Sequence, residues 1–423
     1  MNKIFEMIVS FIGTRWLNKV NTREKLEKYQ ERKIKKHLKF LKKHSPYFRE
    51  NSIDENFRMD KKFMMKNFDS LNTLGIKKEK AMKIALENEK TRNFTKKYGK
   101  FSVGLSSGTS GHRGIFVTTE KEQGIWAGTI LAKMLPEKKI FGHRIAFFLR
   151  ADNDLYKSVN SPVLKLEYFD TFKDIDSHIQ RLNAFSPTIL IGPASMLLSL
   201  CKIKEEGRLD IFPEKIISVA EILEKEDEKF IRKIFGTEYI HQIYQATEGF
   251  LGCTCSYGFI HLNEDIIKFE REYIDDKRFY PIITDFTRRS QPFIKYRLND
   301  ILVENPVPCK CGSVHLRIEK IEGRSDDIFK FISKNGKIVT VFPDFIRRCM
   351  LFTENIREYQ VFQTDYDSLE VAVQNLQTEQ KKEILKEFEN LFISINVENI
   401  NIKFIEYRMD KYVKMKRICQ KMK

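Results

Sequence analysis

Short apolar strands alternate with amphipathic helices through the middle of this chain. Continuous or alternating apolar runs predict strands over 144–149, 163–169, 188–191, 215–220 and 239–244. Apolar positions at helical spacing predict helices over 171–184, 194–204 and 225–235. This alternation is typical of an α/β domain with a parallel sheet. In such a sheet, ligands bind beyond the carboxyl ends of the strands.

The first 95 residues have mainly helical patterns. Residues 23–44 predict one long basic helix that Ser45-Pro46 ends, and residues 79–95 predict another. Residues 3–20 carry apolar residues near helical spacing, which suits either a helix at a membrane surface or a helix packed on the domain. We expect the packing role.

The pattern changes twice towards the C-terminus. From 259 to 319 it is rich in strands, and a boundary is predicted at the glycine-containing segment 323–327. Beyond it, Asn335-Gly336 between two apolar runs predicts a hairpin, followed by a mixture of helices and strands. The sequence thus predicts a large domain over 1–325 and a small α+β domain over 326–423.

Positive charge gathers at the two ends of the chain. The net charge is +17, and residues 1–50 hold 14 Lys and Arg against 5 Asp and Glu. Residues 408–423 hold 7 against 1. Such runs suit an anionic membrane or nucleic acid, but they more often form solvated helix faces, so we do not expect nucleic acid as a partner.

No apolar run is long enough to cross a bilayer, and the apolar stretch 4–12 lacks a cleavage site. Seven cysteines, an odd number with two close pairs, suit metal ligands better than a disulfide framework. We therefore expect a cytoplasmic protein, with peripheral contact to the inner face of the membrane as an open alternative.

A run of small residues lies between two predicted strands, 101–105 and 115–119. It reads Ser106-Ser107-Gly108-Thr109-Ser110-Gly111. Glycines let backbone N–H groups converge, and the hydroxyl groups add donors, so the run suits phosphate oxygens. It lacks the ending of a Walker loop, and taken alone it is also an ordinary turn.

Two further segments bring polar side chains to strand ends. Tyr244-Gln245-Ala246-Thr247-Glu248 offers a ring for a base, a hydroxyl for a phosphate and a carboxylate for Mg²⁺. Tyr296-Arg297-Leu298-Asn299-Asp300 ends in a carboxylate suited to ribose hydroxyls.

In this order, the segments 106–111, 244–248, 296–300 and Gly323-Arg324-Ser325-Asp326-Asp327 resemble the adenylate-forming superfamily. The resemblance is closer to phenylacetate–coenzyme A ligases and related deazaflavin-coenzyme synthetases, and it covers about residues 20–423. It implies a large adenylation domain of parallel and mixed sheets and a small mobile C-terminal domain.

The resemblance also implies roles for single residues. The phosphate loop would include Ser106, Ser107, Thr109 and Gly111. The nucleotide would be bordered by Ala220, Glu221, Tyr244, Gln245, Asp300 and Arg324. Catalysis would use Thr247, Glu248 as the Mg²⁺ ligand, and Lys414 as the lysine that completes the site.

Two departures from the family pattern leave alternatives open. The loop continues Gly111-His112-Arg113-Gly114, so His112 or Arg113 must supply any cation there. Val413 replaces the glycine before the catalytic lysine, so Lys411 and Lys416 remain alternatives to Lys414.

The implied reaction joins ATP and a carboxylic acid to give an acyl-adenylate and pyrophosphate. The acyl group then passes to a thiol such as coenzyme A, or to an amine or hydroxyl acceptor. The sequence identifies neither the acid nor the acceptor, although a polysaccharide-biosynthesis role is possible by analogy. The alternative is a degenerate fold that serves as a basic membrane- or polyanion-binding module.

A second constellation consists of Cys255 and His261 with Cys309 and Cys311. Three sulfur ligands and one nitrogen suit tetrahedral Zn²⁺, although the spacing is not that of a standard finger. A structural zinc cluster in some phenylacetate–coenzyme A ligase relatives matches this pattern. Cys253 is an alternative to Cys255, and the remaining cysteines are expected to be plain thiols.

Overall fold

The chain forms two compact units. The computed structural model describes residues 3–17, 20–91, 94–106, 113–137, 139–149, 164–171, 173–353, 356, 358–408 and 416–422. Unit 1 comprises Met1–Leu298 and Leu302–Lys320, and unit 2 comprises Asn299–Ile301 and Ile321–Lys423. The chain thus passes into unit 2 after residue 320, near the segment 323–327 where the sequence predicts a boundary.

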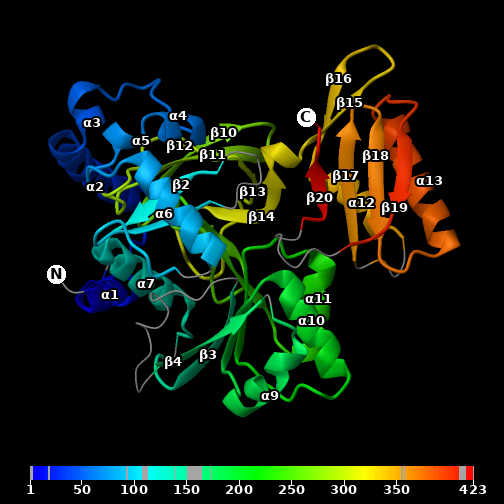
Figure 1. Ribbon diagram of the computed structural model, residues 1–423, viewed down its shortest axis with the longest axis horizontal. Coiled ribbons are helices and arrows are strands. Elements are labelled where there is room, and N and C mark those ends of the chain that lie inside the picture. The colour runs from blue at the N-terminus through cyan, green and yellow to red at the C-terminus, as the bar shows by residue number, and fades with distance from the viewer. Residues whose placement is uncertain are drawn as a thin grey trace. The chain divides into compact units, whose positions relative to one another are not determined.

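One large mixed sheet dominates unit 1 (Figure 1), in the strand order β10-β11-β13-β14-β9-β8-β7-β6-β5-β3-β4, with β12 paired to β11. Its parallel part comprises β3 (His143–Leu149), β4 (Leu164–Asp170), β5 (Ile189–Gly192), β6 (Lys215–Val219) and β7 (Ile240–Ala246). Its other strands are β8 (Gly249–Thr254), β9 (Ile260–Leu262), β10 (Ile267–Tyr273), β11 (Arg278–Asp285), β12 (Tyr296–Arg297), β13 (Asp300–Glu304) and β14 (Arg317–Arg324).

Helices cover both faces of the parallel part. Successive residues of β5 show the two faces. Leu190 packs in one cluster with α9 (Asp176–Phe185), α10 (Ala194–Glu205) and α11 (Lys225–Phe235). Ile189 and Ile191 pack on the opposite face with α7 (Glu120–Met134). Because successive strand residues point to opposite faces, a strand that is apolar throughout is buried on both.

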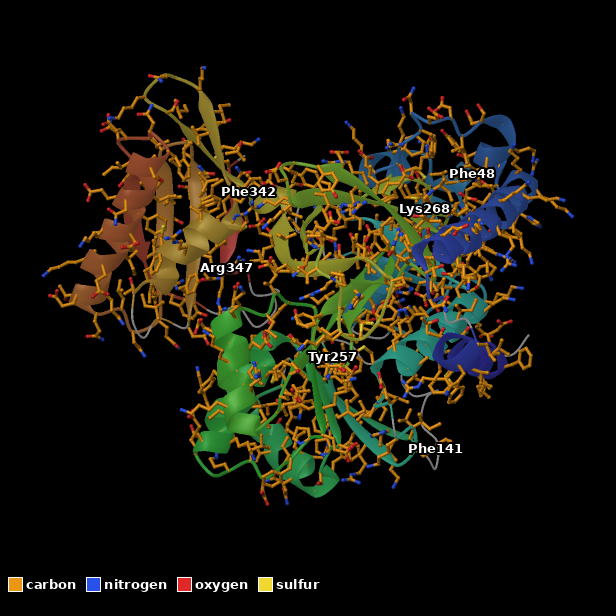
Figure 2. The ribbon with its side chains drawn as sticks, turned by 180° about the vertical axis from the view of Figure 1, so that it is seen from behind. Phe48, Phe141, Tyr257, Lys268, Phe342 and Arg347 are labelled. Carbon is orange, nitrogen blue, oxygen red and sulfur yellow. The ribbon has the colours of Figure 1, made fainter. Side chains whose placement is uncertain are left out.

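The N-terminal segment of unit 1 is helical. Its elements are α1 (Lys3–Ile12), a π-helical turn η1 (Gly13–Leu17), α2 (Arg23–His44), α3 (Pro46–Glu50), α4 (Lys61–Lys66), α5 (Phe68–Leu71) and α6 (Lys78–Thr91). Thr22 caps α2 through a hydrogen bond from the Lys25 N–H, and Pro46 starts the next helix. Phe48 of α3, labelled in Figure 2, is buried among aromatic rings of this segment.

A small hairpin of β1 (Ser102–Leu105) and β2 (Ile115–Thr118) packs on α6. The two strands predicted on either side of the small-residue run are therefore confirmed, and they pair with each other. Residues 107–112, between them, lie outside the described part of the chain.

Unit 2 is built on a four-stranded sheet of order β19-β18-β17-β20. Its elements are η2 (Ser325–Asp327), β15 (Phe329–Ile332), β16 (Ile338–Val341), α12 (Pro343–Leu351), β17 (Tyr359–Asp365), β18 (Ser368–Val373), α13 (Thr378–Ser394), β19 (Asn401–Ile405) and β20 (Ile418–Gln420). The predicted hairpin is confirmed, with Gly336 at a φ of 69° in its turn. Figure 2 labels Phe342, which directly precedes α12.

The sequence patterns predicted most of these elements and missed a few. The predicted helix at 171–184 begins only at Asp176, because β4 runs to Asp170 and a turn follows it, in which the Lys173 N–H donates to the carbonyl of Asp170. The patterns did not predict the short helices α3, α4 and α5 or the three-residue strand β20. They also missed α7, in which apolar and small residues lie on all sides of the helix.

Candidate active site and candidate metal centre

The carboxyl ends of β6 and β7 bring two predicted site segments to one edge of the sheet. The two strands run parallel with Val219 opposite Ile243. Ala220 and Glu221 therefore follow β6 at the level of Tyr244 and Gln245, near the end of β7 at Ala246. This is the edge at which parallel sheets bind ligands.

Glu248 lies in the tight turn between β7 and β8, and both of its carboxylate oxygens have hydrogen-bond donors. The Thr247 hydroxyl donates to Oε2 over 2.8 Å, and the hydroxyl of Tyr296 donates to Oε1 over 3.2 Å. Tyr296 is buried in β12, whereas Glu248 is partly exposed. The carboxylate is thus oriented by two neighbours and still accessible, which suits a ligand for a hard cation such as Mg²⁺.

The segment after β6 has an unusual backbone. Ala220 adopts a φ of 67°, a left-handed conformation that costs a residue with a side chain about 1 kcal/mol or more. The next carboxylate, that of Glu221, accepts a hydrogen bond over 3.0 Å from the backbone N–H of Ser195, in the first turn of α10. The left-handed turn at Ala220 thus directs the Glu221 side chain to the N-terminus of α10, and this hydrogen bond stabilises the turn.

The small-residue loop is closed at its base by Ser106. Its backbone N–H donates to the carbonyl of Gly114 over 2.8 Å, and its hydroxyl accepts from the Gly114 N–H over 2.8 Å. The predicted phosphate-loop residues Ser107, Thr109 and Gly111 lie outside the described residues, as does His112.

Arg113, one of the two predicted loop cations, is described, and it is engaged by Glu89 of α6. One guanidinium nitrogen lies 2.5 Å from a Glu89 oxygen, and the other also forms an ion pair with this carboxylate. Its hydrogen bonds to Glu89 raise the pKa of Arg113, and the guanidinium lowers the pKa of Glu89. The charge of Arg113 is therefore balanced within unit 1.

Unit 2 brings Asp300 and Arg324 together. Nε of Arg324 donates to Oδ1 of the buried Asp300 over 3.2 Å, and the Ser325 N–H donates to the carbonyl of Asn299 over 2.8 Å. Two motifs that lie 24 residues apart in sequence thus form one polar cluster.

The predicted catalytic lysine, Lys414, lies outside the described residues, as does its alternative Lys411. The other alternative, Lys416, is described and donates to Oδ1 of Asp327 over 2.7 Å. Asp327 is buried in η2, so this ion pair joins the segment before β20 to the segment that precedes β15.

The four candidate zinc ligands lie together in unit 1. The ligand atoms of Cys255, His261, Cys309 and Cys311 are all within 4.8 Å of one another. The sulfur atoms of Cys255 and Cys309 are 3.8 Å apart, and Nε2 of His261 is 3.5 Å from the sulfur of Cys311. This donor set suits tetrahedral Zn²⁺.

Cys253, the alternative to Cys255, does not belong to this group. It is buried, its thiol faces Oδ1 of Asn263 at 3.8 Å, and burial raises its pKa to about 11. Figure 2 labels Tyr257, which follows Cys255 in the turn from β8 to β9.

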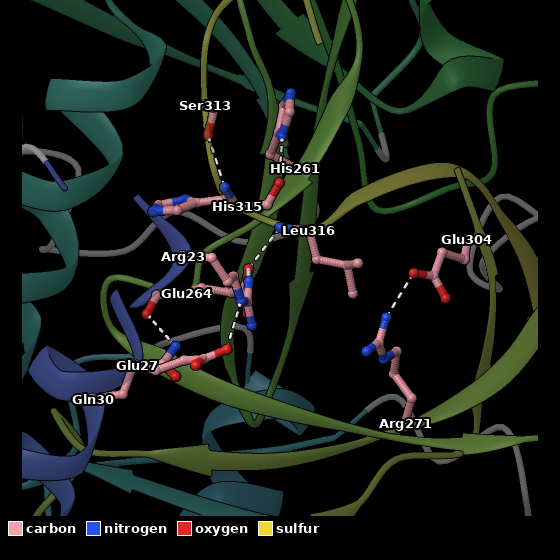
Figure 3. A network of polar contacts seen from close by, with 10 residues as sticks. All are labelled: Arg23, Glu27, Gln30, His261, Glu264, Arg271, Glu304, Ser313, His315 and Leu316. Atoms are coloured by element: carbon pink, nitrogen blue, oxygen red, sulfur yellow. Dashed lines mark hydrogen bonds and ion pairs between the residues drawn. The ribbon is translucent and has the colours of Figure 1, made fainter. Parts of the chain in front are cut away.

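A second layer of contacts orients His261 (Figure 3). Nδ1 of His261 lies 3.1 Å from the carbonyl oxygen of His315, so Nδ1 carries the proton and Nε2 presents its lone pair to the cysteines. Such a partner is a usual feature of metal-binding histidines.

Buried Glu264 holds the same segment from the other side. It accepts hydrogen bonds over 2.6 and 2.7 Å from Arg23 of α2, and over 2.6 Å from the N–H of Leu316. The carbonyl of Glu264 accepts a further bond from Gln30 over 2.7 Å. The helix α2 thus supports the chain on which the candidate ligands lie.

Sequence reasoning missed Tyr296 and Glu264 as parts of these sites. Tyr296 belongs to a motif that the sequence did reveal, but only folding places its hydroxyl beside Glu248. Glu264 belongs to none of the motifs that the sequence revealed.

Comparisons with known proteins point to one kind of fold. No family model matches the chain. A curated relative, an indoleacetate–lysine synthetase from Pseudomonas savastanoi, is 26% identical over 220 residues, which cover 50% of this chain and 48% of that protein. The match thus spans about half the length of that relative.

Solved structures extend the likeness to almost the whole chain. A 2-hydroxyisobutyryl-CoA ligase in the postadenylation state superimposes with a TM-score of 0.61 at 14% identity, covering 93% of this chain and 88% of that one. An amide bond synthetase from Marinactinospora thermotolerans gives 0.52 at 12% identity, covering 73% and 65%. An anthranilate CoA ligase in complex with anthranoyl-AMP also gives 0.52 at 12% identity, covering 74% and 65%. The chain therefore has the fold of the adenylate-forming superfamily, the family that its ordered motifs resemble.

Proposed function

We propose that this chain uses ATP to activate a carboxylic acid as an acyl-adenylate, with release of pyrophosphate, and then transfers the acyl group to an acceptor. The observation that carries this proposal is Glu248, an oriented and accessible carboxylate at the carboxyl end of β7. It lies at the ligand-binding edge of the sheet, in a fold whose solved examples include complexes with acyl-adenylates.

In the first step, a carboxylate oxygen of the acid attacks the α-phosphorus of ATP, and the bond to the bridging oxygen of pyrophosphate breaks. Two anions must approach each other, so the site has to offset their repulsion. Glu248 would hold Mg²⁺, which neutralises charge on the phosphates. Thr247 and Tyr296 keep the Glu248 carboxylate aligned, while the loop closed by Ser106 would offer donors to the pyrophosphate.

The other predicted roles belong to the same proposal. Ala220, Glu221, Tyr244 and Gln245 would border the base at the β6 and β7 ends. Asp300 would accept hydrogen bonds from the ribose hydroxyls, and Arg324, which donates to Asp300, would contact the ribose or phosphate side of the nucleotide. Lys414 would approach the acid and the α-phosphate.

We also propose that Cys255, His261, Cys309 and Cys311 bind a structural zinc ion. Four protein ligands leave no open position, which is the pattern of structural rather than catalytic sites. The ion would fix the segment that carries Cys309 and Cys311 to β9.

The acid and the acceptor are proposed from the relatives. The resemblance to phenylacetate–coenzyme A ligases and the similarity to an indoleacetate–lysine synthetase favour an arylacetic acid. The acceptor is then either a thiol such as coenzyme A or an amine such as lysine. A sugar acid, as a polysaccharide-biosynthesis role would require, is a further candidate.

Carboxylate-dependent exchange of labelled pyrophosphate into ATP tests the activity. We expect exchange with phenylacetate or indoleacetate, and its loss by about 10²-fold or more in Glu248→Gln. The control Glu226→Gln, an exposed carboxylate on α11, should behave as the wild type. Coenzyme A and lysine, added in turn, then identify the acceptor. No exchange with any acid in a broad panel would instead support the degenerate binding module.

A further inference from the structure

The N-terminal helix α1 is fixed to α7 by direct backbone contact. A Cβ atom added to Gly124 would lie 2.4 Å from the carbonyl oxygen of Lys3, and one added to Gly128 would lie 2.2 Å from that of Met7. Both distances are far shorter than a carbon atom tolerates. Only glycine at these two positions, one helical turn apart, allows the helices to come so close.

Side chains on the inner face of α1 add to this attachment. Glu6 is buried and pairs with Lys121 of α7 at 3.0 Å, while Phe11 packs in the cluster beneath the parallel sheet. Arg15 of η1 donates to the carbonyl oxygens of Ala132, Leu135 and Pro136 over 2.5–3.0 Å, where α7 ends. These contacts fix the orientation of α1, and its remaining residues face outward.

The outward face of α1 and η1 is apolar and exposed, with side chains between 39% and 74% accessible. It consists of Ile4, Phe5, Ile8, Val9, Ile12, Trp16 and Leu17. These positions recur at helical spacing along 14 residues, so they form one continuous surface, here called the α1 patch. Large contiguous apolar surfaces on a folded unit mark interaction sites.

The neighbouring helix α2 supplies positive charge. Its ten Lys and Arg residues are all exposed, and they outnumber its three Glu residues. It begins at Arg23, six residues after the α1 patch ends at Leu17. Both helices, drawn in dark blue, lie towards the same end of unit 1 in Figures 1 and 2.

We propose that the α1 patch docks on the surface of an anionic lipid bilayer, with the basic helix α2 adding electrostatic attraction. An amphipathic helix that combines an apolar face with nearby Lys and Arg lies in the plane of the headgroups. A Trp side chain such as Trp16 suits this boundary, because its ring is apolar and its N–H is polar.

Charge and length favour this mode of attachment over the others. A second copy of the chain would bring two basic α2 helices towards each other, whereas an anionic membrane attracts both. No helix among the described residues is long and apolar enough to cross a bilayer. A ten-residue helix spans only about 15 Å, half the thickness of the hydrocarbon layer. The proposal concerns location alone, and it does not depend on the reaction proposed above.

Vesicle flotation of the full chain tests this proposal. We expect binding to vesicles that contain phosphatidylglycerol, little binding to pure phosphatidylcholine, and release as the salt concentration rises. Phe5→Asp with Ile8→Asp should weaken binding by at least about tenfold, because two apolar anchors are lost. A matched control is Phe212→Asp, which alters another exposed phenylalanine (73%, against 55% for Phe5) elsewhere in unit 1.

A spectroscopic readout locates the contact. The chain has two tryptophans, and Trp126→Phe leaves Trp16 as the only one. Its emission should shift to shorter wavelength when anionic vesicles are added. In sedimentation velocity, the wild type and the Phe5→Asp, Ile8→Asp variant should both be monomeric without lipid.

Three results would overturn the proposal. The first is equal vesicle binding by the wild type and the double variant, and the second is no binding of the wild type to anionic vesicles. The third is a wild-type dimer that the double variant abolishes, since it would show that a second copy covers the α1 patch. Equal melting temperatures would establish that the double variant is folded.

Discussion

At the scale of single residues, Glu248 shows how neighbours define the chemistry of a carboxylate. Thr247 is adjacent in sequence, but Tyr296 is 48 residues away and buried in β12. Two donors fix the plane of the carboxylate and leave lone pairs for a cation. A carboxylate that is already oriented loses less entropy when it binds Mg²⁺.

Tyr296→Phe removes one of these donors and keeps the ring. We expect pyrophosphate exchange to fall by about tenfold or more, because a hydrogen bond to a charged group contributes about 1.5–3 kcal/mol. The Mg²⁺ concentration for half-maximal exchange should rise as well. Tyr273→Phe is the matched control, because it removes a tyrosine–glutamate hydrogen bond to Glu304 elsewhere in unit 1. Unchanged Mg²⁺ dependence in Tyr296→Phe would show that the hydroxyl does not position Glu248.

His37 is a second residue whose surroundings determine its properties. It is buried in α2, and neither ring nitrogen has a hydrogen-bond partner among the described residues. Burial, reinforced by the charge of Arg289, lowers its pKa from 6.5 to about 4. The folded chain therefore holds this imidazole neutral at pH values where the unfolded chain protonates it.

This shift predicts a pH-dependent loss of stability. Between pH 6.5 and 4 the unfolded state binds a proton that the folded state does not, so the free energy of unfolding falls as the pH falls. The loss due to His37 amounts to about 3 kcal/mol at pH 4. Denaturant unfolding of His37→Leu should show a smaller decrease than the wild type over this range, while His44→Leu, an exposed control, should match the wild type. Parallel curves for all three proteins would exclude this role of His37.

At the scale of elements, the candidate metal centre joins two parts of unit 1 that themselves contain little regular secondary structure. β9 has only three residues, and the segment 305–316 that carries Cys309 and Cys311 has no helix or strand. Hydrogen bonds from Arg23 and Leu316 to Glu264 support one side of this segment. An ion would support the other side.

Removal of the ion should therefore loosen this segment. We expect about one zinc per chain in the purified protein, and its loss in Cys309→Ser with Cys311→Ser. That variant should melt several degrees lower, and proteases should cleave it within 305–316. Cys253→Ser, a control adjacent to the cluster but not part of it, should retain zinc. The ligand assignment is wrong if the double variant keeps both its zinc and its melting temperature.

At the scale of the whole molecule, the residues proposed for the reaction are divided between the two units. Glu248 belongs to unit 1, whereas Asp300, Arg324 and Lys414 belong to unit 2. In the family that the motifs resemble, the small domain moves between the two half-reactions, so a residue on it should affect them unequally.

Lys414→Ala tests whether this lysine acts in one half-reaction and not in the other. We expect acyl-adenylate formation to fall by about 10²–10³-fold, because a cation is lost where charge develops on the α-phosphate. Transfer of the acyl group from a pre-formed acyl-adenylate should stay nearly normal. Both half-reactions are to be measured in Lys414→Ala, Lys411→Ala and Lys416→Ala.

Each variant has a distinct expected outcome. Lys416→Ala should mainly destabilise unit 2, because it leaves the buried carboxylate of Asp327 without this partner. If Lys416→Ala alone abolishes adenylation in a folded protein, the position of the catalytic lysine is two residues further on. If none of the three does, the C-terminal assignment fails.

The sequence by itself determined what depends on local order. Alternating and helical periodicities identified the strands and helices of the parallel sheet, and Ser45-Pro46 predicted the end of α2. The ordered motifs pointed to the superfamily, because each motif lies at a strand end where short-range patterns are clear. The patterns missed α7 because its glycines and apolar residues lie on all sides of the helix, so that no single apolar face recurs at helical spacing.

Only the tertiary structure decided which distant residues meet. It placed Tyr296 beside Glu248, the two cysteines of segment 305–316 beside His261, and Glu264 between α2 and Leu316. It also showed that α1 packs on α7 with one face while the other stays exposed, although the sequence presented these roles as alternatives. The physical reason is that periodicity in the sequence shows only which side of an element is apolar. Which element packs on that side depends on contacts that form only in the folded chain, such as the backbone contacts of α1 at Gly124 and Gly128.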